Sequence, residues 1–224
     1  MYDYVSEATS LLDDDCCTFY GTNSFNLVWE DVCSKILMNQ LDVPLSHILS
    51  ELRESETLFD EYSADRKTLL DLIDKPVWKK KGSERGIEAA VTLKPDIVTL
   101  HVTVFRDNDK QFKFLIFDAK YYTMTLNDTE VKGQPGVGDV TKQYLYQLAF
   151  QPFINKAKIT DVVNCFIMPT DENIVLNTGT ASMKMLDNLP SLKPIKIRHI
   201  PASVAYDYYL KDRGYDIKQL CLDE

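Results

Sequence analysis

The chain carries an acid, one spacer residue and a lysine at the end of a strongly apolar run, Lys113–Lys120 (KFLIFDAK). Alternate residues of a β-strand share a face, so Asp118 and Lys120 are expected to point the same way. A second acid, Asp96, opens the preceding apolar run in the sequence KPDIV. The polar stretch Arg106–Lys110 separates the two runs and predicts a hairpin. Two carboxylates and an ammonium group would then meet at one end of the hairpin, where they can hold a divalent metal against a phosphate.

The register of this hairpin follows from its loop. Counted from the loop centre, Asp96 is expected opposite Tyr121, within a few residues of both Asp118 and Lys120. The segment Phe112–Phe117 is apolar on both faces, which predicts a central strand. Charged groups at the end of such a strand are energetically costly unless they are paired or take part in function. The alternative is an ion pair on an edge strand, which contributes little to stability.

The pattern Pro95-Asp96 followed by Asp118-Ala119-Lys120 resembles the PD-(D/E)XK nuclease superfamily. Mg²⁺ prefers oxygen ligands and keeps several waters, so one or two carboxylates plus a substrate phosphate suffice to hold it. Asp96, Asp118 and the backbone carbonyl of Ala119 are the expected ligands. The metal would orient or acidify a water, and Lys120 would position that water or stabilise charge on the phosphoryl oxygens.

A helix is predicted downstream, over Thr141–Phe150, with Asp139 or Thr141 as its N-cap. Its predicted apolar face is formed by Val140, Tyr144 and Leu148, with Leu145 as a further candidate. Gln143 and Gln147 are four residues apart and therefore share a face. In the RecB-like branch of the superfamily a glutamine-bearing helix abuts the active site, which implies this role for Gln143, with Gln147 second. The alternative is that both amides are solvated.

An earlier helix is predicted from Asn23 or Ser24, with an apolar stripe formed by Phe25, Val28, Trp29, Val32 and Ile36. The first helix of this superfamily often carries a glutamate that reaches the metal, and Glu30 matches that position. A solvent-facing glutamate is the alternative. The glycine-rich segment 132–140 has no Gly-Lys-Ser/Thr ending and is not a nucleotide-binding loop of that type. It is interpreted either as a loop that approaches the DNA backbone or as a structural loop.

Longer motifs resemble one family more specifically. The opening GTNSFNLVWEDVC, the strand FDAKYY and the stretch PGVGDVTKQYLYQ are similar to the LlaJI family of restriction endonucleases, over about residues 19–213. That family is similar to the nuclease subunit of McrBC systems. The resemblance implies a Mg²⁺-dependent endonuclease subunit that cuts double-stranded DNA and is driven by a separate GTP-hydrolysing AAA+ motor. Family members are longer, so the chain is interpreted as an excised C-terminal portion or one member of a split system.

Two other functions remain open at this point. One is a RecB-like repair or recombination exonuclease, and the other is a non-catalytic nuclease-like scaffold that binds a partner. The intact Asp96, Asp118 and Lys120 argue against the scaffold, and the LlaJI-like segments favour the endonuclease.

Length and composition predict a single nuclease domain over residues 1–224, with 45% hydrophobic residues and a helical insertion at 41–74. No apolar run approaches the ~20 residues that span a bilayer. The five cysteines are odd in number and lack metal-binding spacing, which favours reduced thiols in a cytoplasmic protein, and the resemblance to restriction endonucleases implies a bacterial one.

The net charge of −9 is unevenly distributed. Residues 1–74 hold 4 basic and 16 acidic side chains, whereas residues 75–224 hold 21 basic and 18 acidic ones. This weak attraction for DNA implies that a partner or another domain supplies much of the affinity. The candidate DNA contacts are the basic side chains Lys79, Lys80, Lys81, Arg85 and Lys142, for which solvated surface lysines are the alternative.

The remaining expected elements are two helices within Leu41–Ile73, strands at Val162–Met168, Asn173–Asn177 and Pro194–Ile200, and a closing helix at Ala202–Arg213. The predicted fold class is therefore α/β: a PD-(D/E)XK restriction-endonuclease-like core with a mixed central sheet flanked by helices and a small helical N-terminal addition.

Overall fold

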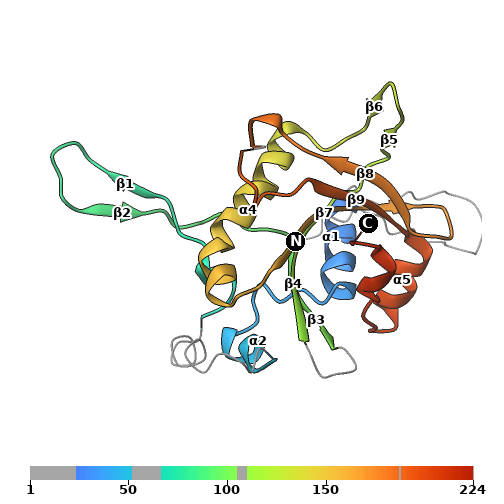
Figure 1. Ribbon diagram of the computed structural model, residues 1–224, viewed down its shortest axis with the longest axis horizontal. Coiled ribbons are helices and arrows are strands. Elements are labelled where there is room, and N and C mark those ends of the chain that lie inside the picture. The colour runs from blue at the N-terminus through green and yellow to red at the C-terminus, as the bar shows by residue number, and fades with distance from the viewer. Residues whose placement is uncertain (1–23, 52–66, 105–109, 187, 224) are drawn as a thin grey trace, which may run out of the picture.

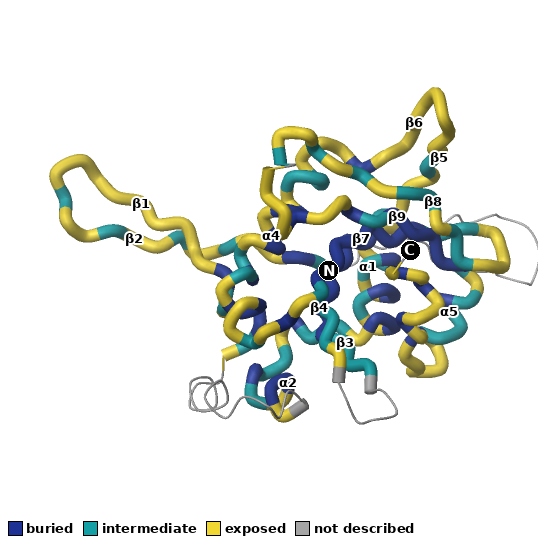
Figure 2. The backbone as a smooth tube through the Cα atoms, in the orientation of Figure 1, coloured by how far each residue is buried: buried dark blue, intermediate teal, exposed yellow. Residues whose placement is uncertain are grey.

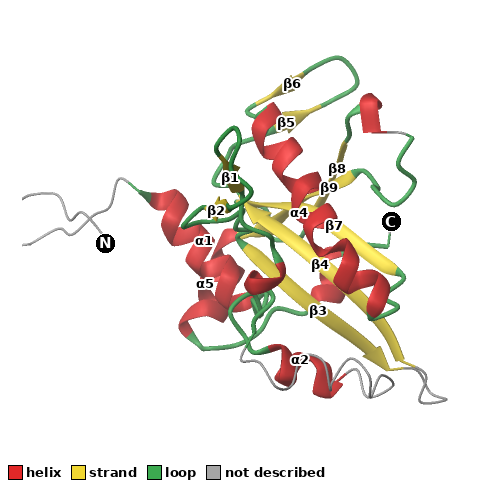
Figure 3. Cartoon of the chain, turned by 90° about the vertical axis from the view of Figure 1, so that its left-hand side faces the viewer, coloured by secondary structure: helices red, strands yellow, loops and turns green. Residues whose placement is uncertain are grey.

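A computed structural model of the protein describes residues 24–51, 67–104, 110–186 and 188–223. Its centre is a mixed five-stranded sheet with strand order β3-β4-β7-β9-β8 (Figures 1 and 3). The strands are β3 (Ile97–Val104), β4 (Lys110–Ala119), β7 (Asp161–Thr170), β8 (Leu176–Ala181) and β9 (Ile195–Pro201). Strands β4, β7 and β9 are parallel, and β3 and β8 run antiparallel at the two edges. The predicted mixed sheet, with the Lys113–Lys120 run on an interior strand, is confirmed.

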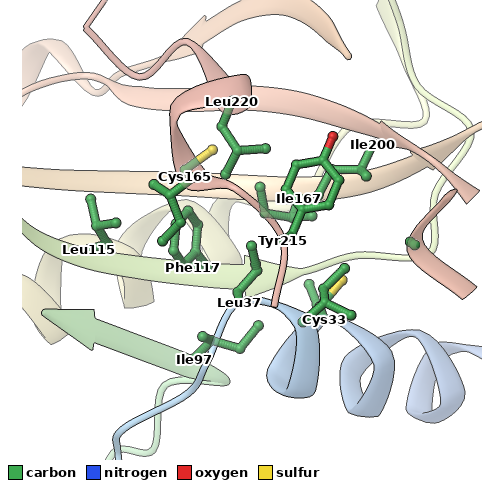
Figure 4. Close-up of a cluster of buried hydrophobic side chains, with 14 of the residues drawn as sticks. Cys33, Leu37, Ile97, Leu115, Phe117, Cys165, Ile167, Ile200, Tyr215 and Leu220 are labelled. Atoms are coloured by element: carbon green, nitrogen blue, oxygen red, sulfur yellow. The ribbon is translucent and has the colours of Figure 1, made fainter. Parts of the chain in front are cut away.

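Helices cover both faces of this sheet. Helices α1 (Phe25–Ile36) and α5 (Ala202–Leu210) pack on one face, where Figure 4 shows Leu115 and Phe117 of β4 among the buried side chains. Helices α4 (Val137–Lys156) and α2 (Leu45–Glu51) cover the other face. There the ring of Phe114 lies 5.1 Å from that of Phe150 on α4. Successive residues of β4 thus point alternately to the two cores, as a strand buried on both faces requires.

The smaller elements lie around this body. They are the 3₁₀ turns η1 (Leu70–Leu72), η2 (Lys184–Leu186) and η3 (Ile217–Leu220), the hairpin β1 (Val77–Lys79)–β2 (Gly86–Glu88), and the ribbon β5 (Thr125–Leu126)–β6 (Val131–Lys132). The β1–β2 hairpin projects away from the body and is exposed along most of its length (Figures 1 and 2). No helix in the described part of the chain is long and apolar enough to cross a membrane. Cys33 and Cys165 are buried free thiols, and Cys221 is an exposed one.

The predicted hairpin register was wrong by three residues. Ile97 pairs with Phe117 and Val104 with Lys110, so the residue facing Asp96 is Asp118 rather than Tyr121. The reason is that β4 begins at Lys110, inside the polar stretch assigned to the loop, which moves the loop centre toward the N-terminus. The correction brings the two acids closer together than predicted.

Helix α4 also differs from the prediction. It begins at Val137 with Gly136 as N-cap, and Asp139 lies in its first turn, from where its side chain accepts the backbone N–H of Gly136. Leu145 and Leu148 are exposed, whereas Gln143, Tyr146 and Gln147 are buried. The predicted apolar face is confirmed for Tyr144, which is buried, and for Val140, which packs against the same core cluster, and it is wrong for the two leucines, because the helix turns its two glutamines toward the protein in their place.

Other boundaries changed less. The strand expected at Asn173–Asn177 is β8, shifted to Leu176–Ala181, and β7 runs through Pro169 to Thr170 instead of stopping at the proline. Helix α5 ends at Leu210, before the expected Arg213. Within Leu41–Ile73 the structure describes α2 and η1, while residues 52–66 lie outside the described residues, as does the predicted cap residue Asn23. Helix α1 and strand β9 agree with the prediction.

Candidate active site

The ends of β3 and β4 bring the two predicted acids and the lysine together. Asp96 immediately precedes β3, and its Oδ2 accepts a hydrogen bond of 3.1 Å from the backbone N–H of Ala119, the last residue of β4. Lys120 continues the line of β4, because its backbone N–H donates to the Ile167 carbonyl of β7 at 2.9 Å. The Lys120 Nζ lies 2.6 Å from Asp118 Oδ1. The chain directions of two adjacent strands therefore fix all three side chains, as the sequence predicted.

Burial makes this cluster electrostatically unusual. Asp118 is only 4% exposed, and burial raises its pKa to about 7, helped by hydrogen bonding and repulsion from Asp96 and opposed by Lys120. Burial lowers the pKa of Lys120, but the hydrogen bond and charge of Asp118 outweigh it and raise that pKa overall. Lys120 is thus held as a cation, while the neighbouring acid pair lacks enough positive charge to ionise freely.

Glu30 of α1 lies within electrostatic reach of the cluster. Burial raises its pKa, the charge of Lys120 lowers it and the charge of Asp118 raises it. Glu30 is half-buried, so the purely solvent-facing alternative does not hold. Its position is compatible with the predicted role near a metal, and that role stays a prediction.

The two glutamines of α4 have different surroundings. Gln147 accepts a hydrogen bond from Asn164 Nδ2 and donates one to the Ser191 carbonyl, both at 2.6 Å, so its amide links α4 to β7 and to the loop before β9. Gln143 is fully buried, and neither atom of its amide has a hydrogen-bond partner among the described residues. The alternative of solvated amides is wrong for both. Of the two, Gln143 is the one whose amide nitrogen and oxygen both lack a partner among the described residues.

Two residues near the cluster were missed as site residues by the sequence reasoning. Asp139 had been considered only as a cap, but its Oδ1 lies 3.4 Å from Lys120 Nζ while its Oδ2 accepts from the Gly136 N–H at 3.0 Å. Tyr146 is buried, and burial raises its pKa to about 12, with further contributions from the charges of Asp118 and Asp96. The available signal was spacing, because Asp139 and Tyr146 lie one helical turn before and after Gln143.

The glycine-rich loop before α4 has a structural role at Gly133. Its φ of +65° is in the left-handed region, and a Cβ there would lie 2.2 Å from the Thr123 carbonyl oxygen. The backbone at this point therefore closes against the segment that follows Lys120, which requires glycine.

The predicted DNA contacts are not gathered in this cluster. Lys79, Lys80, Lys81 and Arg85 are exposed on the projecting hairpin, and Lys142 is exposed near the start of α4. In the described ranges, no group of three or more His, Cys, Asp or Glu side chains is arranged to hold a metal. What the site offers a cation is the Asp96–Asp118 pair. A divalent ion fits this pair chemically, since two carboxylates pressed together at a strand end are stabilised by added positive charge and Mg²⁺ needs few protein ligands.

Comparison with known proteins agrees with the motifs. The family model for the LlaJI restriction endonuclease matches residues 54–204, which include Asp96, Asp118, Lys120 and Gln143. The chain is also similar to the Bacillus subtilis (strain 168) protein named Type II restriction enzyme BsuMI component YdjA, at 27% identity over 205 residues. That alignment covers 91% of this chain and 36% of the relative, so the chain spans little more than a third of the relative's length. No solved structure matches. The chain belongs to the LlaJI restriction endonuclease family.

Proposed function

We propose that this protein is the nuclease part of a restriction system, with a PD-(D/E)XK core that hydrolyses phosphodiester bonds of double-stranded DNA in the presence of Mg²⁺. The observation that carries the proposal is the meeting of Asp96, Asp118 and Lys120 at the ends of two paired strands, with Asp118 and Lys120 2.6 Å apart. A buried structural ion pair would need one acid and one base. The second acid, Asp96, accepts the backbone N–H of Ala119 and raises the pKa of Asp118, so the cluster holds one carboxylate more than an ion pair with Lys120 requires.

Asp96 and Asp118 would hold the metal, which supplies a polarised water and neutralises phosphate charge when bound. The carbonyl of Ala119 is a third candidate ligand, because the N–H and C=O of one extended residue face the same neighbour and this N–H faces Asp96. Glu30 is a fourth, acting from α1.

Lys120 is the proposed stabiliser of charge on the scissile phosphate. Its ammonium is held by Asp118 and Asp139, so it is oriented before substrate arrives. Gln143 contributes an amide with unused donors and an unused acceptor at the first turns of α4. We propose that this amide binds substrate or the attacking water.

A GTP-hydrolysing AAA+ motor is the proposed partner. The relative is named as one component of a restriction enzyme, which supports a multi-subunit assembly. The net charge of −9 also gives the chain little long-range attraction for DNA. A cytoplasmic location follows from this function.

Plasmid digestion tests the proposal. Supercoiled DNA is incubated with Mg²⁺ and the chain alone, and then with a candidate motor subunit and GTP. The expected result is poor cutting by the chain alone and efficient linearisation in the complete mixture, lost in Lys120→Ala. Activity restricted to linear DNA would instead identify an exonuclease, because closed circles have no ends. Efficient cutting by the chain alone would refute motor dependence.

A further inference from the structure

The β1–β2 hairpin is the part of the described structure least explained by folding. None of the residues from Asp74 to Glu88 is buried, and Figure 2 shows this segment standing away from the body. Trp78 and Ile87 face each other across the hairpin and are each 72% exposed. A two-stranded hairpin with no packed face is only marginally stable in water. Large apolar side chains collected on it indicate a contact surface.

The charge of the hairpin selects the kind of partner. Residues 75–88 contain five basic side chains and two acidic ones, in a chain whose net charge is −9. Lys79, Lys80, Lys81 and Arg85 are concentrated beyond the Trp78–Ile87 pair, toward the tip. These basic side chains are suited to bind a polyanion such as DNA. The Trp78–Ile87 pair beside them is suited to contact the sugars and base edges that line a groove.

The tip has a defined shape. The Ser83 N–H donates to the Lys80 carbonyl at 2.9 Å, the Arg85 N–H donates to Ser83 Oγ at 3.2 Å, and Gly82 adopts a φ of +82°. Basic groups on an ordered turn bind with less loss of conformational freedom than the same groups on a disordered segment.

The base of the hairpin lies close to the candidate active site along the chain. Its two legs are joined by the Ala89 N–H to the Pro76 carbonyl at 2.8 Å and by Thr92 Oγ1 to the Asp74 carbonyl at 2.6 Å. Asp96 follows Thr92 by four residues, a span of at most ~14 Å. From its base to its tip the hairpin extends about six residues, or ~20 Å, which corresponds to about six base pairs of duplex.

We propose that the β1–β2 hairpin is a DNA-binding arm that holds the duplex beside the cleavage site, with Lys79, Lys80, Lys81 and Arg85 on phosphates and the Trp78–Ile87 pair against a groove. The inference rests on the proposed nuclease function for the identity of its ligand. Its role is to supply local positive charge that the rest of the chain lacks.

The two tryptophans make the arm directly observable. The chain has only Trp29 and Trp78. Trp29 is fully buried and donates to the Ile167 carbonyl, so acrylamide will quench mainly the fluorescence of Trp78. Titrating the 224-residue chain with a labelled 20-base-pair duplex, in EDTA to prevent cleavage, should reduce acrylamide quenching as binding saturates in anisotropy. Unchanged quenching at saturation would overturn the proposal.

Variants separate the arm from general electrostatics. Lys79→Ala/Lys80→Ala/Lys81→Ala should lower the slope of log affinity against log salt by about 2.7, the value for three phosphate contacts. The matched control neutralises Lys156, Lys158 and Lys193, three exposed lysines at the opposite end of the parallel strands. It should leave the slope unchanged. Trp78→Ala should weaken binding about tenfold at constant slope.

Several outcomes would overturn the proposal of a DNA-binding arm without any measurement of cleavage. Equal effects of the two triple variants on the salt dependence would show that the hairpin lysines act only as part of the overall charge of the protein. Absence of duplex binding by the wild-type chain, or protection of Trp78 by a partner protein but not by duplex, would show that DNA is not its ligand. Binding through the arm without plasmid cleavage under any condition would leave the inference standing and refute the nuclease activity.

Discussion

Replacing Asp118 with asparagine should change how the stability of the metal-free protein depends on pH. Burial raises the folded-state pKa of Asp118 to about 7, from the ordinary aspartate value of 3.8. Between these two values the folded protein binds more protons than the unfolded chain, so its stability falls as pH rises through the window. The asparagine variant cannot ionise and should lack this loss.

The size of the effect follows from the shift. At ~1.36 kcal/mol per pKa unit, the rise of the Asp118 pKa to about 7 corresponds to at most ~4 kcal/mol, and we expect a difference of roughly 2–4 kcal/mol. The stability of Asp118→Asn relative to wild type should therefore be greater at pH 8 than at pH 4 by this amount. Asp118→Asn also removes the carboxylate that faces Lys120. The expected difference already includes this loss, because Lys120 is charged at both pH values.

Urea unfolding in EDTA at pH 4, 6 and 8 measures the difference. The exposed Asp171 provides the matched control, because Asp171→Asn removes a carboxyl group that lies outside the buried acid pair. Adding Mg²⁺ at pH 8 should stabilise the wild type and not Asp118→Asn, by the linkage between binding and folding. A stability difference that stays constant from pH 4 to pH 8 would refute the placement of Asp118 in a buried acid pair.

Further substitutions test the catalytic and structural assignments separately. Lys120→Ala should reduce DNA cleavage by the active assembly ~10²–10³-fold, as measured by initial rates on plasmid, and wild-type rates would assign catalysis elsewhere. In urea unfolding, Gln147→Leu should lower the free energy of unfolding by about 2–3 kcal/mol, because it leaves two buried hydrogen-bonding groups without their partner. Gln143→Leu should leave the free energy of unfolding unchanged or raise it, because its amide has no partner among the described residues to lose. The reverse order would contradict the assignment of the two amides. Gly133→Ala should be strongly destabilising, because the added Cβ would meet a backbone carbonyl. Gly82→Ala should cost only the ~1–2 kcal/mol of an alanine in the left-handed conformation, because its surroundings are open. Equal losses of stability in thermal melts would show that the backbone relaxes the close approach at Gly133.

The sequence predicted the central hairpin and its charged end because strand periodicity and burial leave few alternatives. An unbroken apolar run such as Phe114–Phe117 favours an interior strand, and acids at its end then lie near those of its neighbour. The exact pairing was not predictable, since the boundary between strand and polar loop at Lys110 depends on tertiary contacts. An error of three residues in the register nevertheless left the same side chains in the same cluster.

Helix α4 shows where sequence reasoning fails for a physical reason. Leucines normally mark the buried face of a helix, but here Leu145 and Leu148 are exposed and the two glutamines are buried. Tyr144 is buried as predicted, but the glutamines take the place of the leucines beside it, where one amide bridges two other segments and the other has no hydrogen-bond partner among the described residues. Local rules are often broken where a protein performs a function, so the mistaken face is itself consistent with a site on this side of α4. Asp139 and Tyr146 were missed because their partners, Lys120 and the acid pair, lie on a distant strand.

The shared carboxylate of Asp139 makes the start of α4 and the position of Lys120 mechanically dependent on each other. One oxygen holds the backbone of Gly136 and the other faces the ammonium, so the helix cannot change its first turn without moving the counter-charge of the lysine. Gly133 extends this linkage back to the carbonyl of Thr123, three residues beyond Lys120, and closes a loop in the chain. The segment from Lys120 to Asp139 therefore forms a loop of chain that is closed by the ion pair between these two side chains and narrowed where Gly133 meets Thr123, both of them non-covalent contacts. In this arrangement the loop that precedes the helix helps to keep the Lys120 side chain in position.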